Sequence, residues 1–583
     1  MTSSHASGAP HAGAPHAAGA PHASRYGAKP WLGLLAAVQR APVSPPPTVL
    51  HAFREAVARA PGRTALAYFD GRIGYAEADA LSDSVAGHLA AQGIRRGDRV
   101  AVMLQNTPHF VLAVLAAWKA GAVVVPLNPM YKAGEVGHIL RDSGAAALVC
   151  DGRAWTAYLR ETVRDSAVRT VLTASDLDFQ TRNDPRVFGP VPVPVPGPVP
   201  EPGPDPAGPA PADLLSVARG GRPAPDDPHL TAADTALISY TSGTSGTPKG
   251  AMNPHGALTY NATRQVTSHP LPEGAGYFAL APLFHITGMV CELAACFTNA
   301  GTLVLAHRFD AGAVLDAFLE HRPAYTVGPA TAFMALAAHP GVTPDHFASF
   351  RVISSGGAPL PPALVERLRT AFGFYLRNGY GLTECTAPCA TVPVHLEAPV
   401  DPASGTLSVG LPGADTVVRI LDDRGAEVPF GETGEIVVRG PQVVPGYWGL
   451  PAESAKVFPD GELRTGDVGF MDPDGWLYVV DRKKDMINAS GFKVWPREVE
   501  DVLYTHPAVR EAAVVGVPDA YRGESVKAYV SLRPGTSVEP EELSAHCAAR
   551  IAAYKYPREV EILPVLPKTT SGKILRRELR DRG

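Results

Sequence analysis

Residues 240–250 read YTSGTSGTPKG and follow the apolar stretch 236–238. The two inner glycines let the backbone approach a ligand closely, the hydroxyl groups are donors, and Lys249 adds a positive charge. This pattern predicts a loop that binds polyphosphate. It differs from a Walker loop, because Pro248 stands where that loop has a glycine; a surface turn is the alternative. The residues predicted to bind phosphate are Thr241, Ser242, Gly243, Thr244, Ser245, Gly246, Thr247 and Lys249.

Strand-like and helical patterns alternate on the N-terminal side of this loop. Helical spacing begins after Thr48, a suitable N-cap. Further along, residues 110–120 form a helical pattern closed by Gly121, between the strand-like segments 100–104 and 122–125. This alternation predicts an α/β fold in which helices cover a parallel sheet.

The composition limits the class of protein. The chain has 583 residues, 45% of them hydrophobic and 19% charged, which is typical of a globular protein with a large core. A net charge of −5 provides no basic field for nucleic acid. Six sparse cysteines predict reduced thiols and a cytoplasmic protein. No apolar run is expected to form an integral membrane segment, while peripheral membrane contact stays open.

Glycine and proline together make up 57 plus 58 residues, and proline gathers in two segments. Residues 1–30 repeat Ala, Gly, Pro and His and are predicted to be a disordered leader. In residues 185–211 proline recurs at nearly every second position, which predicts an extended spacer inserted in a domain; a polyproline ligand is the alternative.

A domain boundary is predicted near residue 480. The strand-like segment 476–480 is followed by the charged run DRKKD, and shorter elements follow it. We therefore expect a large N-terminal domain at 48–480, a hinge at 481–484 and a small α+β domain at 485–583.

Six further motifs follow in order along the chain. They are PLFHITGM at 282–289, SSGGAPL at 354–360, NGYGLTEC at 378–385, RTGDVG at 464–469, DRKKDMINASGFKV at 481–494 and PKTTSGK at 567–573. Together with the loop at 240–250, they resemble the adenylate-forming superfamily in its acyl-CoA synthetase branch. The resemblance covers residues 48–583 apart from the insertion. It implies a large AMP-binding domain and a small mobile C-terminal domain.

The resemblance also assigns the nucleotide site, and the chemistry of the residues agrees. The carboxylate of Glu384 suits Mg²⁺ bound with ATP, Thr383 can bond a phosphate, and Tyr380 can stack on adenine. Asp467 can accept hydrogen bonds from the two ribose hydroxyls. The residues implied to bind ATP or AMP are Gly356, Gly357, Ala358, Pro359, Tyr380, Gly381, Thr383, Asp467 and Arg482.

Other assignments concern catalysis and domain movement. Taken alone, His285 would be interpreted as a core histidine and Lys573 as a solvated lysine. The resemblance implies instead that His285 borders the acyl tunnel and that Lys573 stabilises negative charge during adenylate formation. Lys484 would be the pivot. Gly491 and Lys493 would meet CoA. The residues implied in catalysis are Lys573, Glu384, Thr383 and His285, with Glu384 as the metal ligand.

The expected activity is that of an ATP-dependent carboxylic acid:CoA ligase, with ATP, the acid and CoA as partners. Residues 283–290 are largely apolar and lack the acidic residue of amino-acid-activating relatives, and with GLTEC they resemble fatty-acyl ligases. A medium- or long-chain fatty acid is therefore expected. Aryl or alicyclic acids, a carrier-protein thiol as acceptor, a luciferase-like mono-oxygenase and an inactive binding module are the alternatives.

Overall fold

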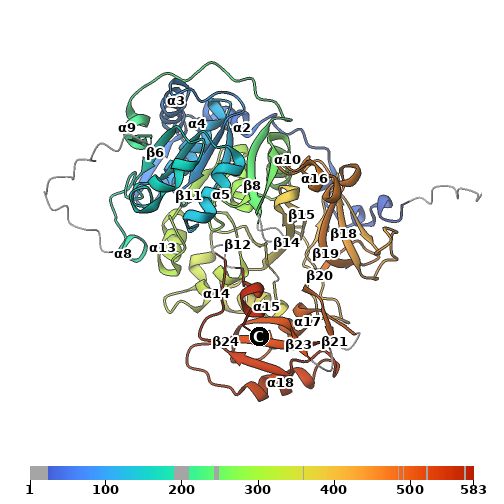
Figure 1. The fold of residues 1–583 in the computed structure, drawn as a ribbon. Coiled ribbons are helices and arrows are strands. Elements are labelled where there is room, and N and C mark those ends of the chain that lie inside the picture. The colour runs from blue at the N-terminus through green and yellow to red at the C-terminus, as the bar shows by residue number, and fades with distance from the viewer. Residues whose placement is uncertain are drawn as a thin grey trace, which may run out of the picture.

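The computed structural model describes residues 24–189, 209–241, 248–358, 360–482, 485–489, 492–519, 523–569 and 573–582. They form a large N-terminal part with three sheets and a small C-terminal part with one sheet (Figure 1). Helices flank the two largest sheets, so the predicted α/β class is confirmed.

The seven-stranded sheet carries the glycine-rich loop. Its order is β7-β6-β5-β3-β4-β8-β9, and its strands are parallel except for the β8–β9 hairpin. Helices α3 (Tyr75–Ala91), α4 (Pro108–Lys119) and α5 (Ala133–Ser143) flank it (Figure 1). The strands are β3 (Arg99–Met103), β4 (Val123–Pro126), β5 (Ala147–Asp151), β6 (Thr170–Ala174), β7 (Pro211–Asp213), β8 (Thr235–Thr241) and β9 (Lys249–Pro254).

The nine-stranded sheet has parallel strands at its centre and antiparallel strands at both edges. In spatial order its strands are β16 (Leu411–Pro412), β15 (Ala387–Thr391), β14 (Leu376–Leu382), β13 (Val352–Ser355), β12 (Tyr325–Gly328), β10 (Gly276–Phe278), β11 (Thr302–Leu305), β1 (Thr64–Tyr68) and β2 (Gly71–Gly74). The associated helices are α10 (His255–Ser268), α11 (Ile286–Gly288), η5 (Met289–Ala294), α12 (Ala295–Thr298), α13 (Ala311–His321), α14 (Ala330–Ala338) and α15 (Pro362–Phe372).

The largest apolar core includes residues of both sheets and most of the segment 110–120, for which a helix is predicted. Every residue of α4 is buried in the protein. Gly121 ends the helix with a φ of +76°, which favours glycine, and β4 follows. This segment is a helix, turn and strand, as its spacing predicts.

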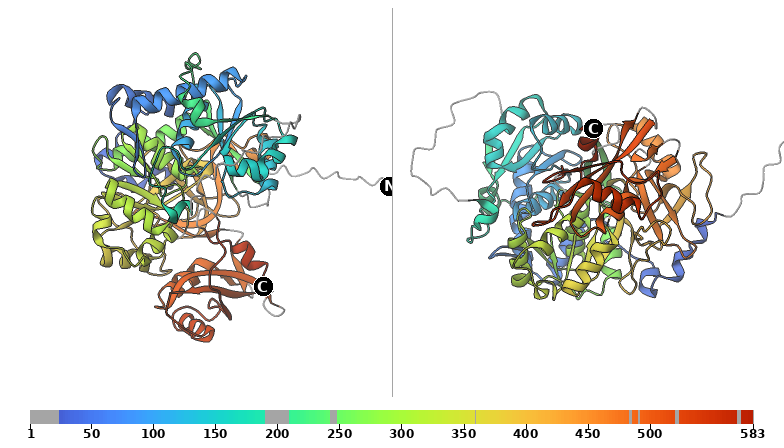
Figure 2. Two further views of the ribbon diagram at one scale, coloured as in Figure 1. Left: turned by 90° about the vertical axis from the view of Figure 1, so that its left-hand side faces the viewer. Right: turned by 90° about the horizontal axis from the view of Figure 1, so that it is seen from below.

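A four-stranded sheet and the C-terminal sheet complete the fold. The four-stranded sheet holds β17 (Val417–Leu421), β18 (Gly434–Arg439), β19 (Leu463–Met471) and β20 (Leu477–Arg482). The C-terminal sheet holds β21 (Ile487–Ala489), β22 (Phe492–Val494), β23 (Val509–Asp519), β24 (Gly523–Leu532) and β25 (Glu559–Ile562). Helices α17 (Pro496–Tyr504), α18 (Pro540–Ala548) and α19 (Arg576–Arg580) accompany it. The left view of Figure 2 shows this part below the large one.

The structure corrects two expected boundaries. The disordered leader was expected to end at residue 30, but folded chain begins by residue 24, because Tyr26 and Trp31 are completely buried. Residues 1–23 lie outside the described part. Order therefore precedes the helix after Thr48, which exists as α2 (Val49–Arg59) with Thr48 Oγ1 accepting from His51 N at 3.0 Å.

The proline-rich insertion is likewise shorter than expected. Its first residues form α8 (Pro185–Phe188), since proline at the first helical turn sacrifices no hydrogen bond there. Its last residue begins β7. Residues 190–208 lie outside the described part. Within the described ranges, no helix has both the length and the apolar character that crossing a membrane requires.

Candidate active site

The hairpin β8–β9 holds the ends of the glycine-rich loop, with Thr241 opposite Lys249 in the ladder. Lys249 Nζ lies 2.5 Å from Glu453 Oε1 and 5.4 Å from the ring centroid of Tyr447. The hydrogen bond from Lys249 lowers the pKa of the Glu453 carboxyl. The predicted residues Ser242, Gly243, Thr244, Ser245, Gly246 and Thr247 lie outside the described part.

Glu384 lies on the turn η7 (Thr383–Cys385), which follows β14, close to Thr241 at the end of β8. Its Oε1 accepts from Tyr447 OH at 2.9 Å and from Thr241 Oγ1 at 3.5 Å. Burial and the Glu384 charge raise the pKa of Tyr447, so this phenol remains a donor. A carboxylate near a loop predicted to bind phosphate matches the ligands that Mg²⁺ takes, one or two carboxylates plus phosphate oxygens. The residues present therefore fit the metal.

The residues predicted to bind the nucleotide come from β14, β19, β20 and the segment after β13. Tyr380 OH donates to Asp467 Oδ2 at 2.7 Å, and Asp467 is only 6% exposed. Burial, followed by the Asp467 charge, raises the pKa of Tyr380. The backbone of Arg482 pairs with Asp467 across β19 and β20. The Arg482 side chain and Pro359 lie outside the described part, whereas Ala358 belongs to the turn after β13.

A cavity of about 170 Å³ is lined by residues of β14, of η7 and of the segment after β13. Seven residues predicted for the site line it: His285, Gly356, Gly357, Tyr380, Gly381, Thr383 and Lys573. Helix α10 contributes another wall, and Leu35 and Gln39, from the N-terminal end of the described part, also line the cavity. The structure therefore brings the C-terminal lysine to residues more than 180 positions earlier.

Lys573 approaches the turn after β13 closely. A Cβ atom on Gly357 would lie 3.2 Å from Lys573 Cε and 3.6 Å from its Nζ, and Gly357 has a φ of +80°. Burial, followed by the charge of Lys573, lowers the pKa of His285 to about 3. His285 is therefore neutral at physiological pH. Its Nδ1 accepts from Thr287 N at 3.4 Å, which fixes the ring at the start of α11.

Comparisons with known proteins identify the family of this chain. The family model "AMP-binding enzyme" matches residues 53–448, and "AMP-binding enzyme C-terminal domain" matches residues 498–573. This chain belongs to the AMP-binding enzyme family. It is 38% identical over 530 residues to a feruloyl-CoA synthase of Amycolatopsis sp., covering 90% of this chain and 96% of that protein. It is 33% identical over 550 residues to a long-chain-fatty-acid–CoA ligase of Bacillus subtilis, covering 92% and 94%.

A solved structure of a CoA ligase is also similar to this AMP-binding enzyme. An anthranilate CoA ligase in complex with anthranoyl-AMP superposes with a TM-score of 0.81, at 26% identity, covering 94% of this chain and 99% of that one. The predicted membership of the acyl-CoA synthetase branch is confirmed.

Sequence reasoning missed the residues that anchor α19, which begins three residues after Lys573. Arg576, on α19, donates through Nη1 to Asp481 Oδ1 at 2.8 Å and through Nη2 to Glu500 Oε2 at 2.7 Å. The segment carrying Lys573 is thereby tied to the end of β20. Only the run of basic residues after Lys573 hinted at such a role, and a solvated basic run looks the same in sequence.

The predicted hinge and CoA residues stay predictions. Lys484 and Gly491 lie outside the described part of the chain. Lys493 lies on β22 at the edge of the C-terminal sheet, and its side chain is likewise outside.

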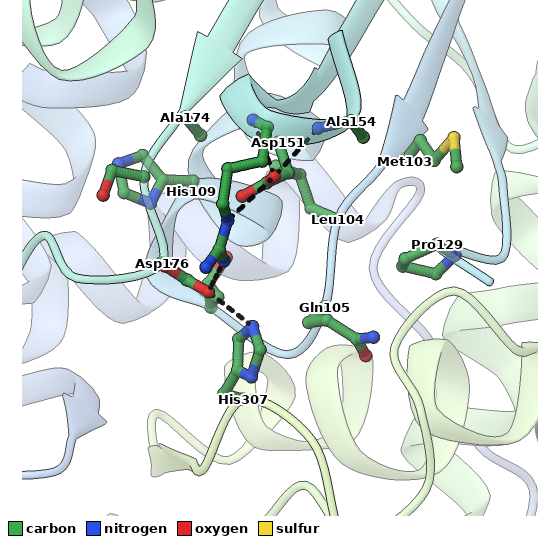
Figure 3. A pocket seen from close by; sticks show the side chains of 13 residues that line it. Met103, Leu104, Gln105, His109, Pro129, Asp151, Ala154, Ala174, Asp176 and His307 are labelled. Carbon is green, nitrogen blue, oxygen red and sulfur yellow. Dashed lines mark hydrogen bonds and ion pairs between the residues drawn. The ribbon is translucent and has the colours of Figure 1, made fainter. Parts of the chain in front are cut away.

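A second cavity of about 160 Å³ lies at the carboxyl ends of β3, β5 and β6 (Figure 3). The ionisable side chains in and around it contact one another. Arg153 contacts Asp176, His307 Nε2 lies 3.4 Å from Asp176 Oδ2, and His109 Nε2 lies 3.1 Å from Asp178 Oδ2. Among the described residues predicted for the active site, none lines it. The first cavity is therefore the candidate active site of this AMP-binding enzyme.

The variant Asp467→Asn tests the nucleotide assignment. The asparagine amide keeps the shape of the side chain and an oxygen that can accept from Tyr380 OH. It removes the negative charge of the carboxylate that is predicted to accept hydrogen bonds from the ribose hydroxyls. We expect the Kd for ATP to rise about 10-fold, measured by calorimetry, because hydrogen bonds to charged groups contribute roughly 1.5–3 kcal/mol. Asp474→Asn, an exposed change in the adjacent turn, is the control. An unchanged Kd would remove Asp467 from the ribose site.

Proposed function

We propose that this protein is an ATP-dependent carboxylic acid:CoA ligase that acts through an acyl-adenylate. One observation carries the proposal: Lys573 from the C-terminal part lines the same cavity as His285, Gly357 and Thr383. A positive charge next to the predicted phosphate-binding residues is what adenylate formation requires.

The first half-reaction transfers AMP to the acid. A carboxylate oxygen attacks the α-phosphorus of ATP, and the bond to the bridging oxygen breaks, so pyrophosphate leaves. Lys573 would stabilise the charge that develops on the α-phosphate, while Lys249 and Thr383 would hold the phosphate oxygens. Mg²⁺, held by Glu384, would neutralise phosphate charge. The neutral imidazole ring of His285, which is fixed in orientation, would limit where the carboxylate can lie.

The second half-reaction forms the thioester. The thiol sulfur of CoA attacks the acyl carbon, the carbon–oxygen bond to AMP breaks, and AMP leaves. No protein nucleophile takes part. We propose that rotation about Lys484 removes Lys573 and brings Gly491 and Lys493 to the site. Gly491 would let pantetheine pass, and Lys493 would meet CoA phosphates.

Two classes of acid are supported by different observations. Ile286, Cys291 and Val327 give the cavity an apolar wall, which supports the expected medium- or long-chain fatty acid. His269 and Tyr325 also line the cavity, with their rings stacked at 5.3 Å. Burial lowers the pKa of His269 to about 4, so it offers a neutral ring nitrogen. An aryl acid with a polar substituent suits this second wall, and we propose it as the first class to test.

The test is an acid panel with the full-length protein, ATP, MgCl₂ and CoA. Benzoate, 4-hydroxycinnamate, octanoate and palmitate are compared by pyrophosphate release, AMP formation and mass spectrometry of the thioester. We expect AMP and thioester in equal amounts, with the highest kcat/KM for 4-hydroxycinnamate. A preference for octanoate or palmitate would favour the fatty-acid class. Pyrophosphate release with a thioester only on a holo-carrier protein would identify a carrier-loading enzyme.

A further inference from the structure

Residues 24–41, here called the strap, reach the candidate active site from outside the region that the family model matches. That match begins at residue 53. Leu35 and Gln39 of the strap line the same cavity as Lys573 and are 7% and 8% exposed. The wall they form is therefore part of the folded cavity.

The first half of the strap is fixed to the four-stranded sheet and its loops. Tyr26 OH donates to the Val428 carbonyl at 3.0 Å, and Lys29 Nζ donates to the Ala414 carbonyl at 2.6 Å. Trp31 is completely buried and packs so closely on Gly475 that a Cβ there would lie 2.6 Å from Trp31 Cβ. The deep-blue strap lies beside this sheet in Figure 1.

The second half of the strap is fixed to α10, a wall of the cavity. Arg264 Nη1 donates to the carbonyls of Gln39 at 3.2 Å and Ala41 at 2.7 Å. Arg264 also pairs with Asp415 and itself lines the cavity. The short helix α1 (Ala37–Arg40) is thereby held against α10.

The two lining side chains differ in chemistry. Gln39 Oε1 accepts from Ala36 N at 3.0 Å at the start of α1, so its amide is oriented and its Nε2 is the donor that it can offer to the cavity. Leu35 adds an apolar surface. Neither carries a charge for the phosphates or the carboxylate, so their chemistry suits the remainder of the acid.

We propose that the strap forms part of the acid-binding pocket, and that Leu35 and Gln39 select the acid by the size and polarity of the end remote from its carboxylate. This inference rests on the proposed ligase function. Leu35 limits the length of the acid, and Gln39 favours an acid whose distal end accepts a hydrogen bond.

The variants Leu35→Ala and Gln39→Leu test the two roles separately in the full-length protein. The kcat/KM for pyrophosphate release is measured with octanoate and decanoate, and with cinnamate and 4-hydroxycinnamate. We expect Leu35→Ala to shift the decanoate/octanoate ratio about 10-fold towards decanoate, and Gln39→Leu to lower the 4-hydroxycinnamate/cinnamate ratio about 10-fold. The KM for ATP should not change.

Val38→Ala is the matched control, since Val38 lies on α1 and is 51% exposed. Its ratios should equal those of the wild type. If a variant fails to fold, Leu35→Val and Gln39→Met make smaller changes with the same expected directions. Unchanged ratios in active variants would overturn the role of the strap and leave the ligase function intact. A wild-type protein that releases no pyrophosphate with any acid would remove the ligase function, and the role of the strap with it.

Discussion

Replacing Lys573 by alanine should slow acyl-adenylate formation about 10²- to 10³-fold, the usual effect of removing one group that stabilises transition-state charge. Lys573 lies close to Gly357 in the cavity, and its positive charge contributes to lowering the pKa of His285. Thioester formation from a supplied acyl-adenylate should keep its rate, because in the proposed cycle Lys573 has left the site by then. Pyrophosphate release measures the first step, and thioester formation from synthetic acyl-adenylate measures the second.

The control is Arg577→Ala, an exposed change on α19 four residues after Lys573. It should retain both rates, which separates the role of Lys573 from a general disturbance of this segment. Equal losses in the two half-reactions of Lys573→Ala would contradict the proposed domain rotation.

Replacing Glu384 by glutamine should lower pyrophosphate release about 10²-fold and raise the Mg²⁺ concentration that gives half-maximal rate. Glutamine can still accept from Tyr447 OH, so the local structure should survive. The lost negative charge is the one proposed to hold the metal. Initial rates across a MgCl₂ titration at saturating ATP measure both effects.

Glu432→Gln changes an exposed carboxyl and should leave the titration curve of the wild type unchanged. Should Glu384→Gln show the wild-type rate and the wild-type Mg²⁺ dependence, Glu384 would not be the metal ligand.

The elements that could be predicted from sequence are those with a local cause. Helix α4 and strand β4 follow from hydrophobic spacing and from Gly121, which ends the helix. The start of α2 follows from the Thr48 cap. The predicted boundaries of the leader and the insertion were wrong, because the average composition of a segment does not reveal single residues that are buried in the fold. Two aromatic residues, Tyr26 and Trp31, are enough to fix the end of a low-complexity segment.

The candidate site also has features that the sequence predicts and features that it does not. The residue types of the loop at 240–250 predicted phosphate binding, and the order of the motifs gave the family that the comparisons confirm. The pairing of Glu384 with Tyr447 and the clamp of Arg576 on Asp481 could not be predicted, since each joins segments far apart in sequence.

The sequence by itself determined the family and the α/β class, and it predicted a loop that binds phosphate, because glycine freedom, charge and spacing are local properties. Only the tertiary structure decided that Lys573 meets Gly357 and that Leu35 and Gln39 line the same cavity. Those contacts depend on how the strap and the C-terminal part pack against the large part. Packing is set by burial and hydrogen bonds between distant segments, which no local pattern encodes.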